Sequence, residues 1–260
     1  MIGSPSRTAS AAMKTTVVMP TYNEADNLVQ IVAELMTLGL DDLHLLIIDD
    51  NSPDGTGKMA DDLAAQYPER VEVIHRRGKM GLGTAYVTGF CHAIESGSDA
   101  VIQMDADFSH SPAYIPAFLD KIRECDVVIG SRYVADGKVD ERWSIWRRFL
   151  SWGGNVYARL ITGLRINDVT SGYRCFRRDA LTALDLDRIR SEGYAFQIEV
   201  AYACQRKGLR LVELPIYFED RSMGLSKMSW RIILEATWRV WQMRWRYRNR
   251  ERPSPPRGTS

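Results

Sequence analysis

Apolar and polar residues alternate along the first half of the chain in blocks that are typical of an α/β protein. Short apolar runs predict strands at residues 15–20, 43–50, 70–75, 100–104 and 126–132, because buried strands are brief and bounded by polar or turn-forming residues. Apolar residues at helical spacing predict helices at residues 24–39, 81–97 and 113–125, and from a cap at Asp54 or Thr56 to Tyr67. This alternation predicts a mostly parallel sheet with helices on both faces.

The pattern becomes less regular after residue 140. We expect a helix containing several tryptophans (Trp143, Trp146 and Trp152), followed by a turn-rich stretch, "INDVTSGYRCFRR", at residues 166–178. A helix at residues 194–208, a strand at 209–218 and a long final helix complete the pattern. We therefore predict one α/β domain at residues 14–227, a final helix at 228–248, and disordered polar ends at 1–13 and 249–260.

The composition narrows the class of protein and its expected location. The 260 residues are 45% apolar and 26% charged, as in an ordinary globular protein with a substantial core. No apolar run reaches the roughly 18 to 20 residues that cross a bilayer, and the start has no signal-peptide pattern. The four cysteines are far apart and form no C-x-x-C pair, which favours thiols in a reducing compartment. We therefore expect a cytoplasmic protein without a transmembrane helix.

Charge is distributed unevenly along the chain. Residues 227–257 contain nine basic and two acidic residues, whereas the remainder contains 25 basic and 31 acidic ones. On the final helix, large apolar residues share one face: Trp230, Leu234, Trp238, Trp241 and Trp245. Tryptophan prefers the bilayer interface and basic residues are attracted to anionic lipid. The helix is thus expected to lie in a membrane interface or to pack its tryptophan face on the domain. Nucleic acid is not expected, because no recognisable binding module surrounds the arginines.

Two carboxylates, Asp105 and Asp107, directly follow a predicted buried strand. Like charges this close repel each other unless a cation lies between them, and Mg²⁺ binds one or two carboxylates together with substrate phosphates. A D-x-D sequence alone is more often a solvated acidic turn. However, Asp49 and Asp50 end one neighbouring strand and Arg132 ends another, and parallel strands share one carboxyl edge. The sequence therefore favours a metal–diphosphate site over an acidic turn.

Eight blocks occur in order between residue 15 and about residue 230: "PTYNEADNL", "IIDDNSPDGT", "RRGKMGLGTAYVTGF", "MDADFSHSP", "IGSRYV", "DVTSGYR", "EGYAFQIE" and "DRSMGLSKMS". Together they resemble the family-2 glycosyltransferases with a GT-A fold, and among these the dolichol- or polyprenol-phosphate mannose synthases. The resemblance implies inverting transfer of mannose from GDP-mannose to a polyprenyl monophosphate, with Mg²⁺ or Mn²⁺ as cofactor. It also implies peripheral association with the cytoplasmic face of a membrane, either direct or through a separate membrane-anchoring protein.

The same resemblance implies roles for individual residues. The guanosine pocket would be lined by Pro20, Tyr22, Glu24, Ile48 and Asp50. The metal ion and the diphosphate would be held by Asp105 and Asp107, with Ala106 between them. The donor phosphates would also contact Arg132, Arg221 and Lys227, and the acceptor phosphate would contact Arg132, Arg147 and Ser151. Catalysis would therefore depend on Asp105, Asp107 and Arg132.

One position departs from the family pattern. Many relatives have glutamine two residues after the second aspartate, where it completes the metal site, whereas this chain has Ser109 followed by His110. A third protein ligand is therefore left open. No dedicated general base is predicted, because a lipid monophosphate already carries about −1.5 to −2 charges if it ionises as phosphoserine does. Glu199 is the best candidate for such a base, but the simpler interpretation is that it is an ordinary carboxylate on a helix.

Three alternatives stay open. The "GKMGLG" loop at residues 78–83 could cradle a phosphate through backbone N–H groups or form a simple turn on the donor side, with Lys79 as a supporting charge. Another donor such as UDP-glucose is possible, because no physical rule reads the base or the sugar from these residues. A non-catalytic nucleotide-binding or adaptor subunit would keep the fold, but such a protein would be expected to lose part of the set Asp105, Asp107, Arg132, Arg221 and Lys227.

Overall fold

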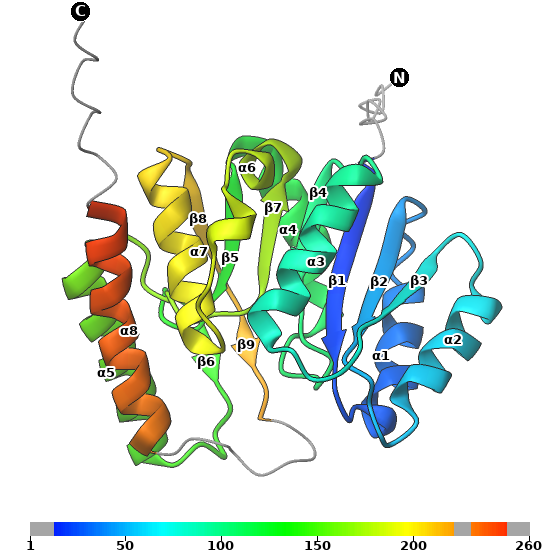
Figure 1. The fold of residues 1–260 in the computed structure, drawn as a ribbon, viewed down its shortest axis with the longest axis horizontal. Coiled ribbons are helices and arrows are strands. Elements are labelled where there is room, and N and C mark those ends of the chain that lie inside the picture. The colour runs from blue at the N-terminus through cyan, green and yellow to red at the C-terminus, as the bar shows by residue number, and fades with distance from the viewer. Residues whose placement is uncertain (1–12, 221–229, 249–260) are drawn as a thin grey trace, which may run out of the picture.

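The computed structural model describes residues 13–220 and 230–248, which are drawn in colour in Figure 1. The two predicted disordered ends lie outside these residues except for Met13. Arg221 and Lys227, which were predicted to contact the donor phosphates, also lie outside the described residues.

Seven strands form the central sheet, in the order β3-β2-β1-β4-β7-β5-β8. Their bounds are β1 Thr15–Thr21, β2 Leu43–Asp49, β3 Val71–His75, β4 Ala100–Gln103, β5 Val127–Ser131, β7 Arg174–Arg177 and β8 Leu211–Pro215. All neighbours pair in parallel except β7, which runs antiparallel to β4 and β5. The five strands predicted between residues 15 and 132 are therefore confirmed, and so is the mostly parallel sheet.

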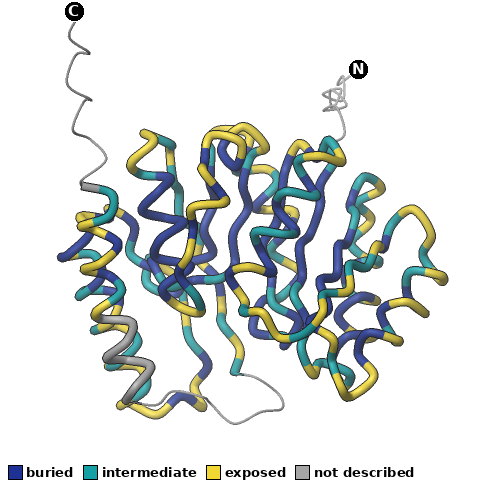
Figure 2. Tube along the Cα trace, in the orientation of Figure 1, coloured by how far each residue is buried: buried dark blue, intermediate teal, exposed yellow. Residues whose placement is uncertain are grey.

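Helices cover both faces of this sheet, as the alternation predicts (Figure 1). Their bounds are α1 Ala25–Met36, α2 Thr56–Gln66, α3 Leu82–Glu95, α4 Ile115–Lys121, α5 Ile145–Thr162, α6 Arg178–Thr182, α7 Tyr194–Arg206 and α8 Trp230–Arg248. Successive side chains of a strand point to opposite faces. Val18 of β1 accordingly packs in a core with α3, α5, α6, α7 and α8, whereas Val17 packs in a second core with α1, α2 and α4. Figure 2 shows these buried strands between partly exposed helices.

The stretch at residues 166–178 contains the central strand β7, so its interpretation as turn-rich is wrong for residues 174–177. Only Cys175 and Phe176 of this strand are apolar, and an arginine at each end hides the pattern. Arg174 is nevertheless fully buried, and its side chain donates hydrogen bonds to the backbone oxygens of Val169 and Ser171. Burial lowers the pKa of Arg174 to about 10. This buried arginine therefore fixes the segment that precedes β7.

The strand predicted at residues 209–218 is divided between two sheets. Its first part is β8 at the edge of the main sheet, and its last two residues form β9 (Tyr217–Phe218). β9 pairs in parallel with β6 (Lys138–Val139) in a separate two-stranded sheet. The chain segments that follow β5 and β8 are thereby held side by side.

The final helix α8 packs against α5 and α7 at one end of the molecule (Figure 1). Val240 and Met243 are buried in the core on that face. Arg246 forms an ion pair with the buried Glu199 of α7, with 2.9 Å between Nη1 and Oε1. The helix is therefore docked on the domain through these residues.

Three tryptophans of α8 lie on its exposed side. Trp238, Trp241 and Trp245 are 65%, 52% and 70% exposed. The alternative in which the tryptophan face packs on the domain is therefore wrong for these three residues. In the part of the chain that the structure describes, no helix is long and apolar enough to cross a membrane.

Candidate active site

The predicted site residues gather at the edge of the sheet where β1, β2, β4 and β5 end. Pro20 lies near the end of β1, Asp50 follows β2, residues 105–107 follow β4 and Arg132 follows β5. Parallel strands bring their carboxyl ends to one edge, which is the usual ligand position in open α/β sheets. This edge points downward in Figure 1.

Asp105 is held from two sides. Its Oδ1 accepts a hydrogen bond from the Tyr86 hydroxyl at 2.5 Å, and its backbone N–H donates to Nδ1 of His110 at 3.0 Å. Burial and the charge of Asp105 raise the pKa of Tyr86 well above its ordinary value, so the phenol remains a donor. A Cβ at Gly172 would lie 3.3 Å from the His110 ring and 3.6 Å from Oδ2 of Asp105. Glycine at position 172 therefore leaves room for the His110 ring, whereas the distance to the carboxylate is that of an ordinary contact.

Asp107 is buried and is held by Ser109, whose N–H and hydroxyl donate to Oδ1 at 3.1 and 2.5 Å. Asp105 and Asp107 offer oxygen donors, which a hard divalent cation prefers. Within residues 13–220 and 230–248, no group of three His, Cys, Asp or Glu side chains could hold a metal ion. By its oxygen donors alone, the pair fits an ion whose remaining ligands are phosphate oxygens and water.

Arg132 is fixed by Asp168. Its Nε and Nη2 donate to the two carboxylate oxygens of Asp168, each at 2.7 Å, and Nη2 also donates to Thr170 at 2.8 Å. Burial opposes the charged form of Arg132, but the Asp168 carboxylate outweighs it, so the pKa of Arg132 lies above its ordinary value. A guanidinium has five N–H groups, and among the described residues these bonds leave the two on Nη1 for a ligand.

The residues that support Asp168 have no recognisable signal in the sequence. Glu213 of β8 accepts from the N–H groups of Asn167 and Asp168, at 2.7 and 2.8 Å. Asn155 of α5 accepts from the N–H of Val169 at 2.8 Å. Both supports come from elements distant in sequence, so only the fold reveals them. They fix the segment that carries the partner of Arg132.

Arg147 also has a carboxylate partner. Its Nη1 donates to both oxygens of Asp220, at 2.9 and 3.0 Å, and its guanidinium carbon lies 3.9 Å from the centre of the Trp143 ring. The ring of Trp143 meets that of Phe218 edge to face, and the Phe218 ring lies 5.1 Å from the guanidinium of Arg132. An aromatic pair therefore connects the two predicted phosphate-binding arginines.

Ser151 is brought to the same region, because its hydroxyl is 2.7 Å from that of Tyr133, the residue after Arg132. Arg148, next to Arg147 in the sequence, instead donates to the backbone oxygens of Asp140 and Glu141. Arg147 is therefore the arginine of this pair that lies over the aromatic pair next to Arg132.

The donor side contains an ion pair that the sequence reading missed. Nε and Nη2 of Arg76 donate to the two oxygens of Asp50, at 2.5 and 2.8 Å. Nζ of Lys79 lies 4.2 Å from the centre of the Tyr22 ring. The loop that carries Arg76 and Lys79 therefore lies beside two residues predicted to bind guanosine.

Other residues predicted for this pocket differ in exposure. Pro20, Tyr22 and Glu24 are half-buried at the edge of the sheet. Ile48 and Ala106 have buried side chains within the two cores. In this arrangement the two residues, 0% and 3% exposed, offer a nucleotide almost no surface.

Gly81 and Gly83 of "GKMGLG" serve close packing, whereas a Cβ at Gly78 would meet nothing within 4 Å. The N–H of Gly83 donates to the Glu192 carboxylate at 3.1 Å, and a Cβ at Gly83 would lie 2.6 Å from the backbone oxygen of Ser191. Because this amide at the start of α3 already has a carboxylate partner, the turn interpretation is favoured over a phosphate cradle.

Glu199 is a structural carboxylate. It is fully buried, and Oε2 accepts from the N–H groups of Arg190 and Ser191, at 3.3 and 2.9 Å. Oε1 accepts from Arg246 of α8 at 2.9 Å. These bonds explain its burial without a catalytic role, in agreement with the simpler interpretation of this residue.

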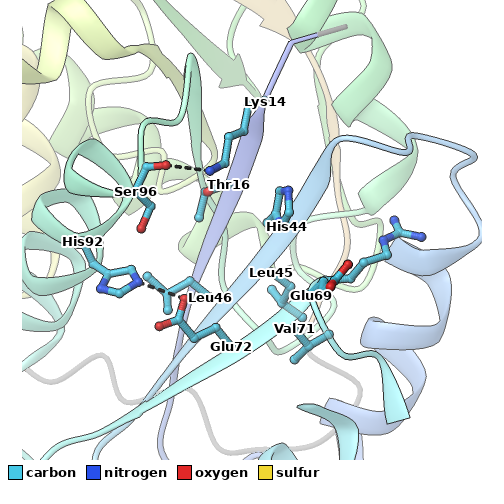
Figure 3. Close-up of a pocket in the computed structure, with 11 residues that line it drawn as sticks. Lys14, Thr16, His44, Leu45, Leu46, Glu69, Val71, Glu72, His92 and Ser96 are labelled. Carbon is cyan, nitrogen blue, oxygen red and sulfur yellow. Dashed lines mark hydrogen bonds and ion pairs between the residues drawn. The ribbon is translucent and has the colours of Figure 1, made fainter. Parts of the chain in front are cut away.

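A pocket of about 350 Å³ lies at the opposite edge of the sheet (Figure 3). Some of its polar side chains bond to one another or to nearby backbone: Nζ of Lys14 donates to the Ser96 oxygen at 2.6 Å, and His92 is 2.9 Å from Glu72. None of the predicted site residues lines it. This pocket is therefore separate from the candidate site.

The sheet order, the inserted antiparallel strand and the carboxylates after β4 define a GT-A glycosyltransferase. Two solved structures share the fold. Mannosyl-3-phosphoglycerate synthase from Rubrobacter xylanophilus has a TM-score of 0.64 and 18% identity, over 95% of this chain and 77% of that one. Glucosyl-3-phosphoglycerate synthase from Mycobacterium tuberculosis has a TM-score of 0.62 and 17% identity, over 90% and 79%.

The chain belongs to glycosyl transferase family 2, whose model matches residues 16–184. An undecaprenyl-phosphate mannosyltransferase from Micrococcus luteus is 45% identical over 224 residues, which cover 86% of this chain and 91% of the relative. A polyprenol monophosphomannose synthase from Mycolicibacterium smegmatis is 43% identical over 248 residues, which cover 94% and 92%. The family resemblance inferred from the sequence is confirmed.

Proposed function

We propose that this glycosyltransferase transfers mannose from GDP-mannose to a polyprenyl monophosphate, with inversion at the anomeric carbon. The observation that carries the proposal is one sheet edge that combines Asp105 and Asp107 with Arg132 and, across the aromatic pair, Arg147. Such an edge suits a diphosphate donor and a phosphate acceptor. The names of the two curated relatives support mannose and the lipid acceptor.

Asp105 and Asp107 would hold a divalent ion, Mg²⁺ or Mn²⁺, together with the donor diphosphate. When bound, such an ion supplies neutralisation of the charge that develops on the leaving nucleoside diphosphate. A structural neighbour crystallised with Mn²⁺ and UDP supports this cofactor class.

The acceptor side needs positioning rather than proton removal. A monophosphate is already anionic near neutral pH, and guanidinium groups suit phosphate oxygens. Nη1 of Arg132 offers two N–H groups from a fixed position. Arg147 would provide the second contact after exchanging Asp220 for the phosphate. The two arginines would thus hold the nucleophilic oxygen in line with the sugar.

The surface beside the acceptor side supports docking on an anionic membrane. Exposed residues of α5 form an aromatic row of Trp146, Phe149 and Trp152, with ring centres 5.8 and 6.4 Å apart. The neighbouring α8 adds its three exposed tryptophans. α5 contains no acidic residue, and neither does the described part of the α8 surface at residues 238–247. Aromatic and basic residues without acids are typical of a bilayer-interface contact.

The first experiment mixes purified protein with radiolabelled GDP-mannose, Mn²⁺ or Mg²⁺ and a short polyprenyl phosphate, followed by organic extraction. Label in the organic phase that disappears with EDTA is expected. Transfer from UDP-glucose and not from GDP-mannose would be consistent with the proposed mechanism but would contradict the proposed donor. No transfer from any nucleotide sugar by folded protein would contradict the enzyme assignment.

Membrane contact is tested by sedimentation with phosphatidylglycerol-containing vesicles. Replacing Trp146 and Trp241 with serine should reduce the bound fraction, whereas Val29→Ser, at an exposed position on α1, serves as the matched control. Equal binding of all three proteins would remove this surface from the proposal.

A further inference from the structure

Two buried side chains outside the predicted site contact Asp105. Tyr86 reaches it from α3, and its ring is stacked between Phe90 and Phe196, with 5.9 Å between ring centres in each pair. Tyr86 is fully buried. Its hydroxyl therefore approaches Oδ1 of Asp105 from a fixed direction, at 2.5 Å.

His110 holds the same aspartate through the backbone. Its ring is 2% exposed, lies 4.9 Å from the Tyr173 ring at an interplanar angle of 14°, and meets Phe218 edge to face. Nδ1 accepts the N–H of Asp105 at 3.0 Å. A ring nitrogen that accepts this bond uses its lone pair for it, so Nδ1 cannot bind a metal ion in the same arrangement.

The residues that replace the family's glutamine therefore support both carboxylates. Ser109 donates twice to Oδ1 of Asp107, and His110 accepts from Asp105. Partners of this kind orient metal ligands, and their loss typically weakens metal binding or activity about 10- to 100-fold.

We propose that Tyr86 and His110 are positioning residues that direct Asp105 toward the metal–diphosphate complex, with His110 acting as a hydrogen-bond acceptor through Nδ1 and not as a metal ligand. The inference rests on the proposed function, because it requires Asp105 to contact the ion.

Four variants separate this role from others. Tyr86→Phe removes one hydroxyl and keeps the stacked ring. His110→Phe keeps an aromatic ring and removes the acceptor. His110→Asn keeps an acceptor near the Nδ1 position, and His110→Gln moves it one bond further out. Thermal unfolding of each variant controls for loss of structure.

The main readout is the dissociation constant for Mn²⁺, measured from the electron paramagnetic resonance signal of the free ion in the presence of GDP. Tyr86→Phe and His110→Phe should weaken binding about 10- to 100-fold. His110→Asn should stay within about threefold of the unsubstituted protein and bind more tightly than His110→Gln. Electron spin echo modulation of the bound Mn²⁺ should show no directly coordinated imidazole nitrogen.

Distinct results would overturn the inference. A coordinated imidazole nitrogen would make His110 a ligand. Equal weakening by His110→Asn and His110→Phe would show that the acceptor is not what matters. Unchanged binding in folded Tyr86→Phe and His110→Phe would overturn the positioning role alone, because the unsubstituted protein still binds Mn²⁺. If the unsubstituted protein itself bound no Mn²⁺ with GDP, the metal part of the proposed function would fail as well.

Discussion

Arg132 and Arg147 lie at the two ends of the Phe218–Trp143 pair, but they are held in different ways. The side chains of Arg132 and Asp168 are 6% and 0% exposed and meet through two parallel hydrogen bonds. Those of Arg147 and Asp220 are 28% and 26% exposed, and a single nitrogen makes the contact. The fold therefore fixes the first arginine, whereas a ligand can replace the partner of the second.

The largest effect is expected from Asp168→Asn. Removal of one partner leaves Arg132 buried without its counter-charge, which costs about 3–5 kcal/mol in the free energy of unfolding. Urea denaturation followed by circular dichroism measures this cost. A loss of stability below about 1 kcal/mol, as for an exposed pair, would mean that Arg132 is held no more firmly than Arg147.

The same ion pair can be tested by measuring the free energy of unfolding as a function of pH. Burial raises the pKa of Asp168, but the positive charge of Arg132 lowers it by a larger amount. The pKa of Asp168 therefore lies below its ordinary value. The stabilisation is thus fully present above the unfolded-state pKa of about 3.9 and is lost as the pH falls through the folded-state pKa. The stability gap between the unsubstituted protein and Asp168→Asn should be constant from pH 8 to about pH 5, and it should narrow only at lower pH.

A smaller effect is expected from Arg147→Ala. A hydrogen bond to a charged group is worth about 1.5–3 kcal/mol, so the KM for polyprenyl phosphate should rise roughly 10- to 100-fold while the KM for GDP-mannose changes little. Initial-rate kinetics with each substrate varied in turn tests this split. Arg148→Ala is the matched control, because Arg148 bonds to backbone oxygens; an equal rise in that variant would contradict the assignment.

The smallest effect is expected from Asp220→Asn. Its half-exposed ion pair contributes about 0–1 kcal/mol, so stability should hardly change. Weaker competition for Arg147 should lower the KM for polyprenyl phosphate by at most about fivefold. An increase in that KM would mean that Asp220 helps to form the acceptor site instead of occupying it.

Local pattern predicts the fold well where a strand contains a run of at least three apolar residues, as in β1, β2 and β5. It fails at β7, because the burial of Arg174 depends on backbone oxygens of Val169 and Ser171 that only the folded chain supplies. A buried charge in a short strand has no signature in a hydrophobicity pattern.

In the candidate site, too, the sequence predicts some residues and misses others. Asp50, Asp105, Asp107 and Arg132 could be placed from their positions after apolar runs, since strand ends share one edge. Their partners could not be placed in this way. Tyr86, Arg76 and Asp168 are common residue types on other elements, and their significance arises from contacts that bridge 19 to 36 residues of sequence.

The position of β7 has a consequence for the order in which a growing chain can acquire its parts. Among the strands of the described residues, β5 pairs only with β7 and β8, and both follow it in the sequence. A nascent chain that ends before residue 168 can already carry the D-A-D carboxylates at the end of β4. In such a chain β5 has no neighbour in the sheet, and Arg132 lacks Asp168. The two carboxylates proposed to bind the donor metal thus precede the counter-charge of Arg132 in the sequence, and synthesis of residues 168–177 supplies both the missing strand and that counter-charge.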